Sequence, residues 1–255
     1  MRPPGVRPSF AGMDDRRLCR IGAAAAIAGA AAQLVATALE PDSSGDLNKA
    51  VRVVADSGSW NGDRLLDLIG VFLTVAALTV VGRTFAEGTE RDWARIGQPF
   101  LLLMAALGAT AVFAGANMKE MANAWAGAAP HAQQSYLAAF DASRNAKDDL
   151  FFGAFLALGL YLATLAMALL AGRIYVRWIG WAAAVSATLV LTGDLLLLAV
   201  EAAFLAVLVG FALFTLVLIA LGASMWQHAR RPHRGATAGA REVQRRAPAL
   251  TLRDL

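Results

Sequence analysis

One apolar stretch, residues 179–226, constrains the fold of this chain more than any other feature. Only two charged residues, Asp194 and Glu201, interrupt it, and both lie near its middle. A single straight helix of this length would be about 70 Å long at ~1.5 Å per residue, whereas the apolar core of a bilayer is only ~30 Å thick. The stretch is therefore expected to cross a membrane twice, with its turn near the two carboxylates.

The composition extends this conclusion to the whole chain. Of the 255 residues, 58% are hydrophobic and 16% are charged, against about 45–50% and about 25% in soluble domains. The single cysteine, Cys19, excludes an intramolecular disulfide and a cysteine-based metal cluster. We therefore predict an all-α fold: one transmembrane domain, residues 16–227, with spans at about 21–39, 65–81, 97–116, 150–171, 178–196 and 202–226.

Both ends of the chain are expected to be disordered. Residues 1–15 are rich in Pro and Gly and have no apolar periodicity, although Met13 is an alternative start, and residues 228–255 form a basic tail rich in Arg. The first apolar run follows Arg16, Arg17 and Arg20, an arrangement also typical of a cleaved signal peptide. A retained span is favoured, because five further spans follow it.

Two polar segments between spans are expected to contain short amphipathic helices. In residues 40–63, Leu47, Ala50, Val51 and Val54 follow i, i+3, i+4, i+7 spacing, and Asp46 is a suitable N-cap. Residues 117–149 contain two apolar faces separated by Pro130. These helices would lie on the membrane surface or cap the bundle.

The distribution of positive charge predicts the orientation. Seventeen of the 23 Lys and Arg residues fall on the side of the two termini, and six fall on the other side. The positive-inside rule then places both termini in the cytoplasm of a cell whose plasma membrane the chain spans. Tryptophan is expected at the membrane interfaces, and all six lie at or near predicted span ends: Trp60, Trp93, Trp125, Trp178, Trp181 and Trp226. For Trp125 a place in the outer cap is the alternative.

Acidic residues at the outer ends of the spans are the candidate functional residues. An ionisable group inside a membrane is costly and indicates function by default, so we consider a ligand or proton site formed by Asp63, Asp67, Asp149, Asp194 and Glu201. A structural interpretation competes with it. Asp63 would cap a helix N-terminus, Asp67 would pair with Arg64 three residues earlier, and Asp194 and Glu201 would flank an exposed turn.

Other kinds of site are not supported by the sequence. The three histidines, His131, His228 and His233, lie outside the predicted spans, which argues against a bis-histidine haem site and a membrane zinc hydrolase. The Ser and Thr residues of the spans have no His partner for nucleophilic catalysis. We therefore predict no catalytic residues, no cofactor and no metal. Nucleic-acid binding is not expected either, because no groove-reading or stacking motif accompanies the basic charge.

The motif Trp60-x-x-x-Arg64-Leu65-Leu66-x-Leu68-x-Gly70, together with Lys119, Trp125 and Pro130, resembles a family of uncharacterised six-helix bacterial integral membrane proteins. In that family a His often stands where this chain has Arg64. The resemblance implies a multi-pass plasma membrane protein and no particular reaction.

Three functions remain open. The favoured one is a non-enzymatic membrane component, a scaffold or sensor with an outer acidic rim. The alternative is a small transporter of a cation or protonatable solute that uses Asp67 and Asp194, and the third is a membrane enzyme that acts on lipid. The expected partners are the bilayer and, for the Arg-rich C-terminal tail, anionic lipid headgroups.

Overall fold

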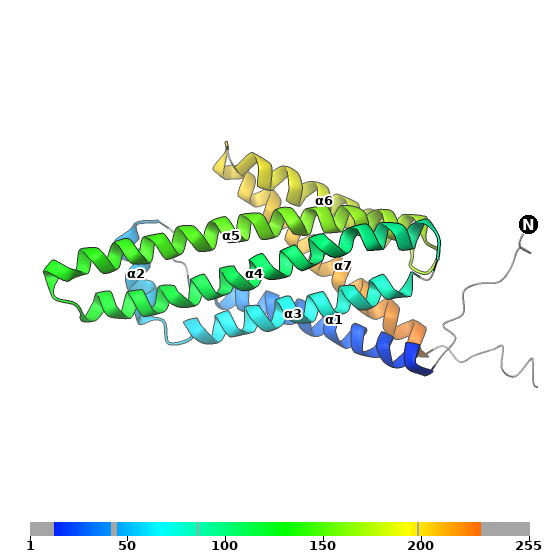
Figure 1. Cartoon of the computed structure of the whole chain (residues 1–255), viewed down its shortest axis with the longest axis horizontal. Coiled ribbons are helices and arrows are strands. Elements are labelled where there is room, and N and C mark those ends of the chain that lie inside the picture. Colours follow the sequence, from blue (N-terminus) through cyan, green and yellow to red (C-terminus); the bar gives the residue numbers. More distant parts are fainter. Residues whose placement is uncertain (1–12, 42–44, 86, 198, 231–255) are drawn as a thin grey trace, which may run out of the picture.

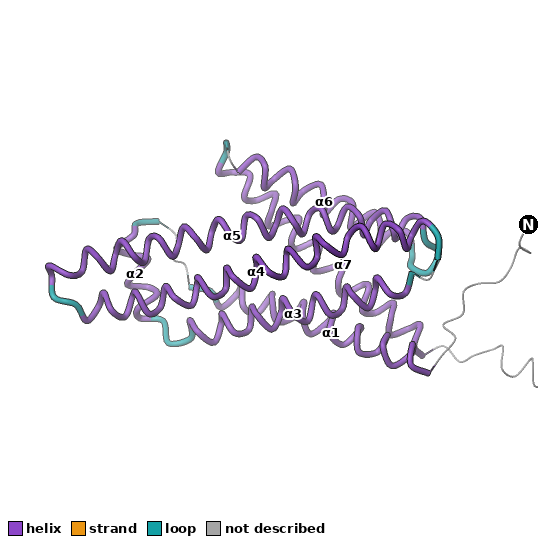
Figure 2. Tube along the Cα trace, in the orientation of Figure 1, coloured by secondary structure: helices purple, strands orange, loops and turns teal. Residues whose placement is uncertain are grey.

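A computed structural model of the chain describes residues 13–41, 45–85, 87–197 and 199–230. The expected N-terminal tail lies largely outside these residues, and the C-terminal tail lies outside them from residue 231 onward. The described part is entirely helical apart from its connections (Figures 1 and 2). Its elements are α1 (Met13–Leu39), α2 (Leu47–Asp56), α3 (Trp60–Thr84), α4 (Thr89–Gly127), α5 (Pro130–Ala171), α6 (Arg177–Leu197), the 3₁₀ turn η1 (Glu201–Ala203) and α7 (Phe204–Arg230).

Six of these helices are long and apolar enough to cross a membrane: α1, α3, α4, α5, α6 and α7. The predicted all-α bundle of six membrane helices is therefore confirmed. Each helix packs against the one before and after it, and α7 packs back on α1, so the six form a closed ring in chain order. In this ring α3 and α6 occupy opposite positions.

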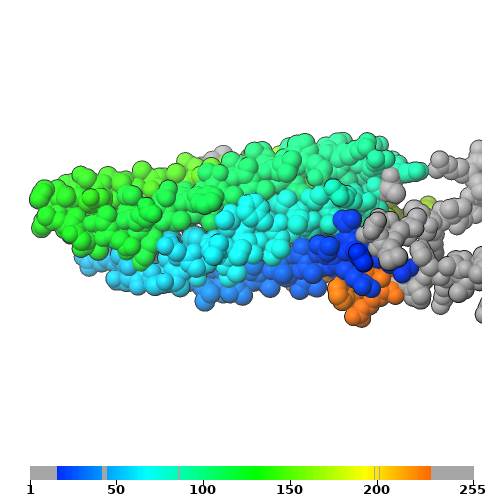
Figure 3. Space-filling view, turned by 60° about the horizontal axis from the view of Figure 1, so that its bottom comes forward, coloured from blue at the N-terminus to red at the C-terminus, as the bar shows by residue number. Residues whose placement is uncertain are grey.

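Two of the helices are much longer than a membrane span. With 39 and 42 residues, α4 and α5 measure about 58 and 63 Å at ~1.5 Å per residue, about twice the thickness of a bilayer core. Figures 1 and 3 show this pair extending past the ends of the other helices. The amphipathic segments expected between the third and fourth spans are thus continuous with those spans, and Pro130 begins α5.

The extension of α4 and α5 carries α2 on its side, as Figure 1 shows and as the contacts of α2 with α4 and α5 confirm. We call residues 45–58 and 115–147 the outer lobe, and the end of the bundle that carries it the lobe end. The opposite end, where α1 begins and α7 ends, is the terminal end. The helix expected from the spacing of Leu47, Ala50, Val51 and Val54 is confirmed, with Asp46 accepting a hydrogen bond from the Lys49 amide.

Small residues bring neighbouring membrane helices into close contact. A Cβ at Gly210 of α7 would lie 2.8 Å from Val190 Cγ2 and 3.0 Å from the Val190 amide nitrogen of α6. At the same crossing the Ser186 hydroxyl donates a 2.7 Å hydrogen bond to the Gly210 carbonyl. Membrane helices commonly associate in this way, because lipid provides no hydrophobic force that would press the helices together.

The short connection between α5 and α6 is fastened to the terminal end by Tyr175. Its hydroxyl lies 3.0 Å from the Thr84 hydroxyl at the end of α3, and its ring packs edge-on against Phe85 and near His228 of α7. Burial raises the pKa of the Tyr175 phenol, so the hydroxyl stays neutral and remains a donor or acceptor. The contact joins three parts of the ring at this end.

Candidate functional site

A network of charged residues built around two buried cations, Arg64 and Lys147, lies where the outer lobe meets the membrane helices. At its centre is Arg64 of α3, whose side chain is 3% exposed. Its guanidinium lies 2.6 Å from the Glu40 carboxylate, just past α1, and 3.2 Å from the carboxylate of Asp67. The ammonium of Lys147 in α5 lies 3.5 Å from the same Glu40 oxygen and 3.9 Å from Asp148. We call these five residues the Arg64 cluster.

Two neighbouring residues hold Arg64 in this position. Trp60, one turn earlier on α3, donates a 2.7 Å hydrogen bond from its indole nitrogen to the Gly115 carbonyl of α4. The Arg64 guanidinium lies over the Trp60 ring, 4.8 Å from its centroid, an arrangement that is attractive when desolvated. A Cβ on Gly115 would come within 3.2 Å of Arg64 Cδ and 3.4 Å of Lys147 Cδ, so the absence of a side chain there leaves room for both cations.

The Arg64 cluster is a network of opposite charges that contains one more carboxylate than cation. Two cations face three carboxylates, and each carboxylate has a cation within 4.0 Å. Glu40 is the shared group, since both cations approach one of its oxygens. A buried charge that lacks such partners is strongly unfavourable, so the arrangement joins α1, α3 and α5 at one point.

Of the acidic residues predicted as a site, Asp63 and Asp67 lie one turn apart on α3, whereas Asp149 is on α5 and Asp194 on α6. Asp67 pairs with Arg64, as the structural interpretation expected. Asp63 is buried at the start of α3 and accepts a 2.9 Å hydrogen bond from the Ser59 hydroxyl. Asp149 is exposed. Glu201 begins η1, and its side chain is not among those the structure describes.

Asp194 differs from the other predicted residues. It lies near the end of α6, only 1% exposed, and neither carboxylate oxygen has a hydrogen-bond partner within the described part of the chain. It is on α6, across the ring from Asp67 on α3, so the structure does not pair these two carboxylates. A carboxylate buried in this way is costly and is the clearest candidate for a functional acid.

The outer lobe has a small hydrophobic core of its own. Seven side chains from α2, α3, α4 and α5 are buried together: Ala50, Val51, Val54, Trp60, Met118, Ala122 and Phe140. Trp60 therefore belongs to this core as well as to the support of Arg64. The core of the lobe and the position of Arg64 therefore both depend on Trp60.

Lys119 of α4 fastens α2 to the lobe. Its ammonium donates hydrogen bonds of 2.9, 2.7 and 2.8 Å to the carbonyls of Val54, Ala55 and Ser57. Carbonyls at a helix C-terminus have no partner within the helix, and a cation there also favours the helix dipole. One lysine thus satisfies the end of α2 and positions the whole helix.

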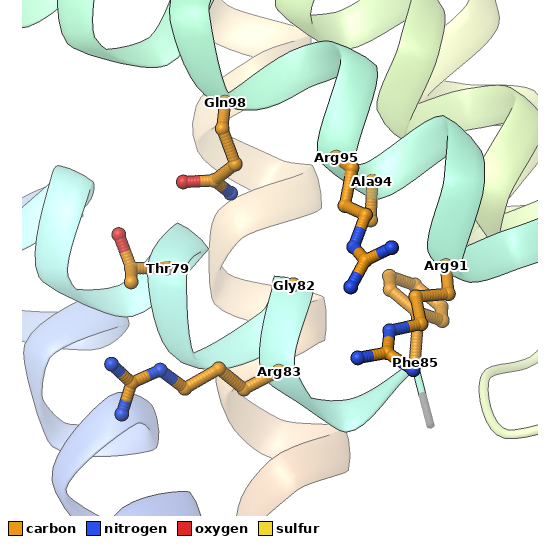
Figure 4. Close-up of a pocket in the computed structure, with 8 residues that line it drawn as sticks. All are labelled: Thr79, Gly82, Arg83, Phe85, Arg91, Ala94, Arg95 and Gln98. Atoms are coloured by element: carbon orange, nitrogen blue, oxygen red, sulfur yellow. The ribbon is translucent and has the colours of Figure 1, made fainter. Parts of the chain in front are cut away.

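A pocket at the terminal end was not anticipated from the sequence. It occupies about 420 Å³ between the end of α3 and the start of α4, and Figure 4 shows three arginine side chains around it. Its lining residues are Thr79, Gly82, Arg83, Phe85, Arg91, Ala94, Arg95 and Gln98. In the sequence these arginines indicate only the orientation of the chain in the membrane. The four-residue spacing of Arg91 and Arg95, which places both on one helix face, was the available signal.

Comparisons with known proteins identify no family, since no family model matches the chain and neither curated proteins nor solved structures give a significant match. Of the resemblance noted from the Trp60–Gly70 motif, the six membrane helices are confirmed. The chain is a multi-pass integral membrane protein.

Proposed function

We propose that the protein is a non-enzymatic membrane component, a scaffold or sensor, whose outer lobe meets a ligand or partner. The observation that carries the proposal is that the lobe is joined rigidly to the membrane helices: α4 and α5 run through both parts without a break. The Arg64 cluster and the Trp60–Gly115 hydrogen bond tie the junction further. A contact made on the lobe would therefore be transmitted to the spans.

The test is photo-crosslinking in cells that express the full chain. A photoreactive phenylalanine analogue is placed at Gln134 or Tyr136, both exposed on the lobe, or at Leu102, which is 62% exposed on α4 within the membrane. We expect a discrete protein adduct of one mass at the lobe positions and only lipid adducts at Leu102. Equal adducts at all three positions, or none at the lobe, would contradict the proposal.

Asp194 favours a second function, transport of a cation or a protonatable solute. Its burial without a hydrogen-bond partner among the described residues is the supporting observation, whereas Asp67 is paired with Arg64 and supports this function less. The test is uptake of Na⁺, K⁺ or protons into proteoliposomes by wild type and Asp194→Asn, with Asp149→Asn as the matched control. Transport predicts uptake that only Asp194→Asn abolishes; wild-type uptake no higher than that of empty liposomes would remove this alternative.

We further propose that both termini face the cytoplasm and that the membrane is the plasma membrane. The excess of arginine on the terminal side supports this orientation. Reporter fusions after residue 255 and within the connection after Gly127 distinguish the two orientations. If a reporter that works only outside the cytoplasm is active when fused to the C-terminus, the proposed orientation is wrong.

The Arg-rich tail is proposed to bind anionic lipid headgroups. From residue 231 onward it lies outside the described residues, and the proposal is supported by its composition alone. Binding to phosphatidylglycerol vesicles is expected to fall with salt and to decrease when residues 231–255 are deleted. Unchanged binding after the deletion would refute it.

A further inference from the structure

The pocket at the terminal end has three positively charged residues and no negatively charged residue among the described residues that line it. Arg83 comes from α3, and Arg91 and Arg95 come from successive turns of α4. No carboxylate lines the pocket, since Glu90 and Asp92 of the first turn of α4 are not among the lining residues. Within the described part of the chain no ion pair joins any of the three arginines to an acidic residue. The guanidinium groups therefore keep their donors available.

The other lining groups favour an anion with oxygen atoms. Figure 4 shows Arg91 and Arg95 reaching toward the space beside Gly82, with the Gln98 amide above it. A Cβ on Gly82 would lie 3.1 Å from the Gln98 side-chain nitrogen, so the missing side chain leaves this donor accessible. Guanidinium and amide donors converging on one space match the oxygens of a phosphate group, which arginine binds through paired N–H donors.

The position of the pocket corresponds to the headgroup level of a bilayer. It lies where α3 ends and α4 begins. At the same end of the bundle, Trp178 and Trp181 at the start of α6 are 56% and 62% exposed, and Trp226 near the end of α7 is 39% exposed. Exposed tryptophans at span ends are typical of the membrane interface.

Apolar side chains continue from the pocket into the membrane region. Leu102 of α4 lies two turns beyond Arg95 and is 62% exposed, and Phe72 of α3 lies two turns before Thr79 and is 55% exposed. Residues seven apart share one face of a helix. Each helix thus carries a polar pocket residue and an exposed apolar residue on the same side, which suits a ligand with a polar head and hydrocarbon chains.

We propose that this pocket is a binding site for the phosphate group of an anionic phospholipid, with Arg91 and Arg95 as the cationic ligands. Its lining residues belong to neither the outer lobe nor the C-terminal tail. The phosphate accepts hydrogen bonds from the guanidinium groups, and the acyl chains lie along α3 and α4.

The test is native mass spectrometry of the full chain purified in detergent and titrated with dioleoyl phosphatidylglycerol. The matched pair is Arg91→Gln/Arg95→Gln and Arg173→Gln/Arg177→Gln: both remove two exposed arginines from the terminal end, but the second pair lies outside the pocket. All proteins retain the tail, so its contribution is common. We expect one lipid to bind to wild type and to the control, and about thirtyfold weaker binding to the pocket variant, from roughly five- to sixfold per arginine.

Two further binding measurements identify the ligand. Dioleoyl phosphatidylcholine, which has no net charge, is expected to bind several-fold more weakly than phosphatidylglycerol, and millimolar inorganic phosphate is expected to compete poorly. If both double variants lose phosphatidylglycerol affinity equally, the effect is one of overall charge, and the proposed site is overturned. Phosphate that binds as tightly as the lipid, with the same dependence on Arg91 and Arg95, would overturn the lipid assignment in favour of a soluble anion.

Discussion

The guanidinium of Arg64 lies 2.6 Å from the carboxylate of Glu40, and this pair joins the end of the first membrane helix to the start of α3. The same Glu40 oxygen lies 3.5 Å from the Lys147 ammonium, so α5 is included in the junction. A residue just outside the first span thus connects three helices. The pair also lies directly under the outer lobe, because Trp60 contacts both Arg64 and the lobe core.

Replacing Arg64 should strongly destabilise the protein. Arg64→Ala leaves Glu40 and Asp67 facing each other with only Lys147 to compensate them, and breaking a buried pair in this way costs about 3 kcal/mol or more. The free energy of unfolding is measured by denaturant titration in mixed micelles. The control, Arg52→Ala, removes an exposed arginine 5.9 Å from the Trp125 ring and should cost no more than about 1 kcal/mol. Equal effects of the two substitutions would show that the Arg64 cluster contributes no special stability.

Replacing Lys119 should loosen α2 without unfolding the membrane helices. Lys119→Met removes three hydrogen bonds to the end of α2, and bonds to a charged donor contribute about 1.5–3 kcal/mol each when measured singly. Hydrogen–deuterium exchange should therefore rise over residues 47–57 and stay unchanged in α6 and α7. The neighbouring exposed residue provides the control, Glu120→Gln. Protection of α2 equal to that of wild type would mean that its apolar contacts suffice.

Adding one methyl group at Gly210 should separate α6 from α7. The new Cβ of Gly210→Ala would lie 3.0 Å from the backbone of Val190, and such overpacking typically costs about 1–3 kcal/mol. Gly108→Ala is the control, because its Cβ would meet only Val71 Cγ2, at an ordinary 3.8 Å. It should be neutral or stabilising by up to about 1 kcal/mol. If unfolding shows no difference between these variants, the close approach of α6 and α7 is not required for stability.

Replacing Asp194 by its isosteric amide should maintain or increase stability. An amide is cheaper to bury than an ionised carboxylate, and the described residues provide Asp194 with no hydrogen bond that would be lost. Thermal unfolding of Asp194→Asn is compared with that of Asp149→Asn, an exposed acid that should change little. A marked loss of stability in Asp194→Asn would mean that the carboxylate has a stabilising partner such as a bound cation.

Local sequence patterns were sufficient to predict much of the fold. Six charge-poor runs predicted six membrane helices, and the spacing of Leu47, Ala50, Val51 and Val54 predicted α2. The pairing of Asp67 with Arg64 followed from their separation of three residues. These features depend on residues within a few turns of each other, and such relationships can be recognised in a single sequence.

The remaining features depend on contacts between distant segments. Glu40 meets Arg64 and Lys147 only because α1 and α5 both pack near the start of α3, and no local pattern encodes that meeting. The apolar faces on either side of Pro130 indicated a helical extension and a second helix leading into the fourth span, as α4 and α5 show, but the packing of α2 against both could not be predicted. The positive-inside rule already accounted for the arginines of the pocket, so their position around one cavity was not recognised.

The ring of helices has a consequence for how the protein is made. Because neighbours in the ring are also neighbours in the chain, each new helix can pack on the preceding one as it leaves the ribosome, with no need to pass between helices already inserted. The exception is the surface of α1 that faces α7, where Ala23 and Ala26 meet Gly222. This surface lacks its partner until α7 is synthesised, so the ring can close only after all six membrane helices have been made.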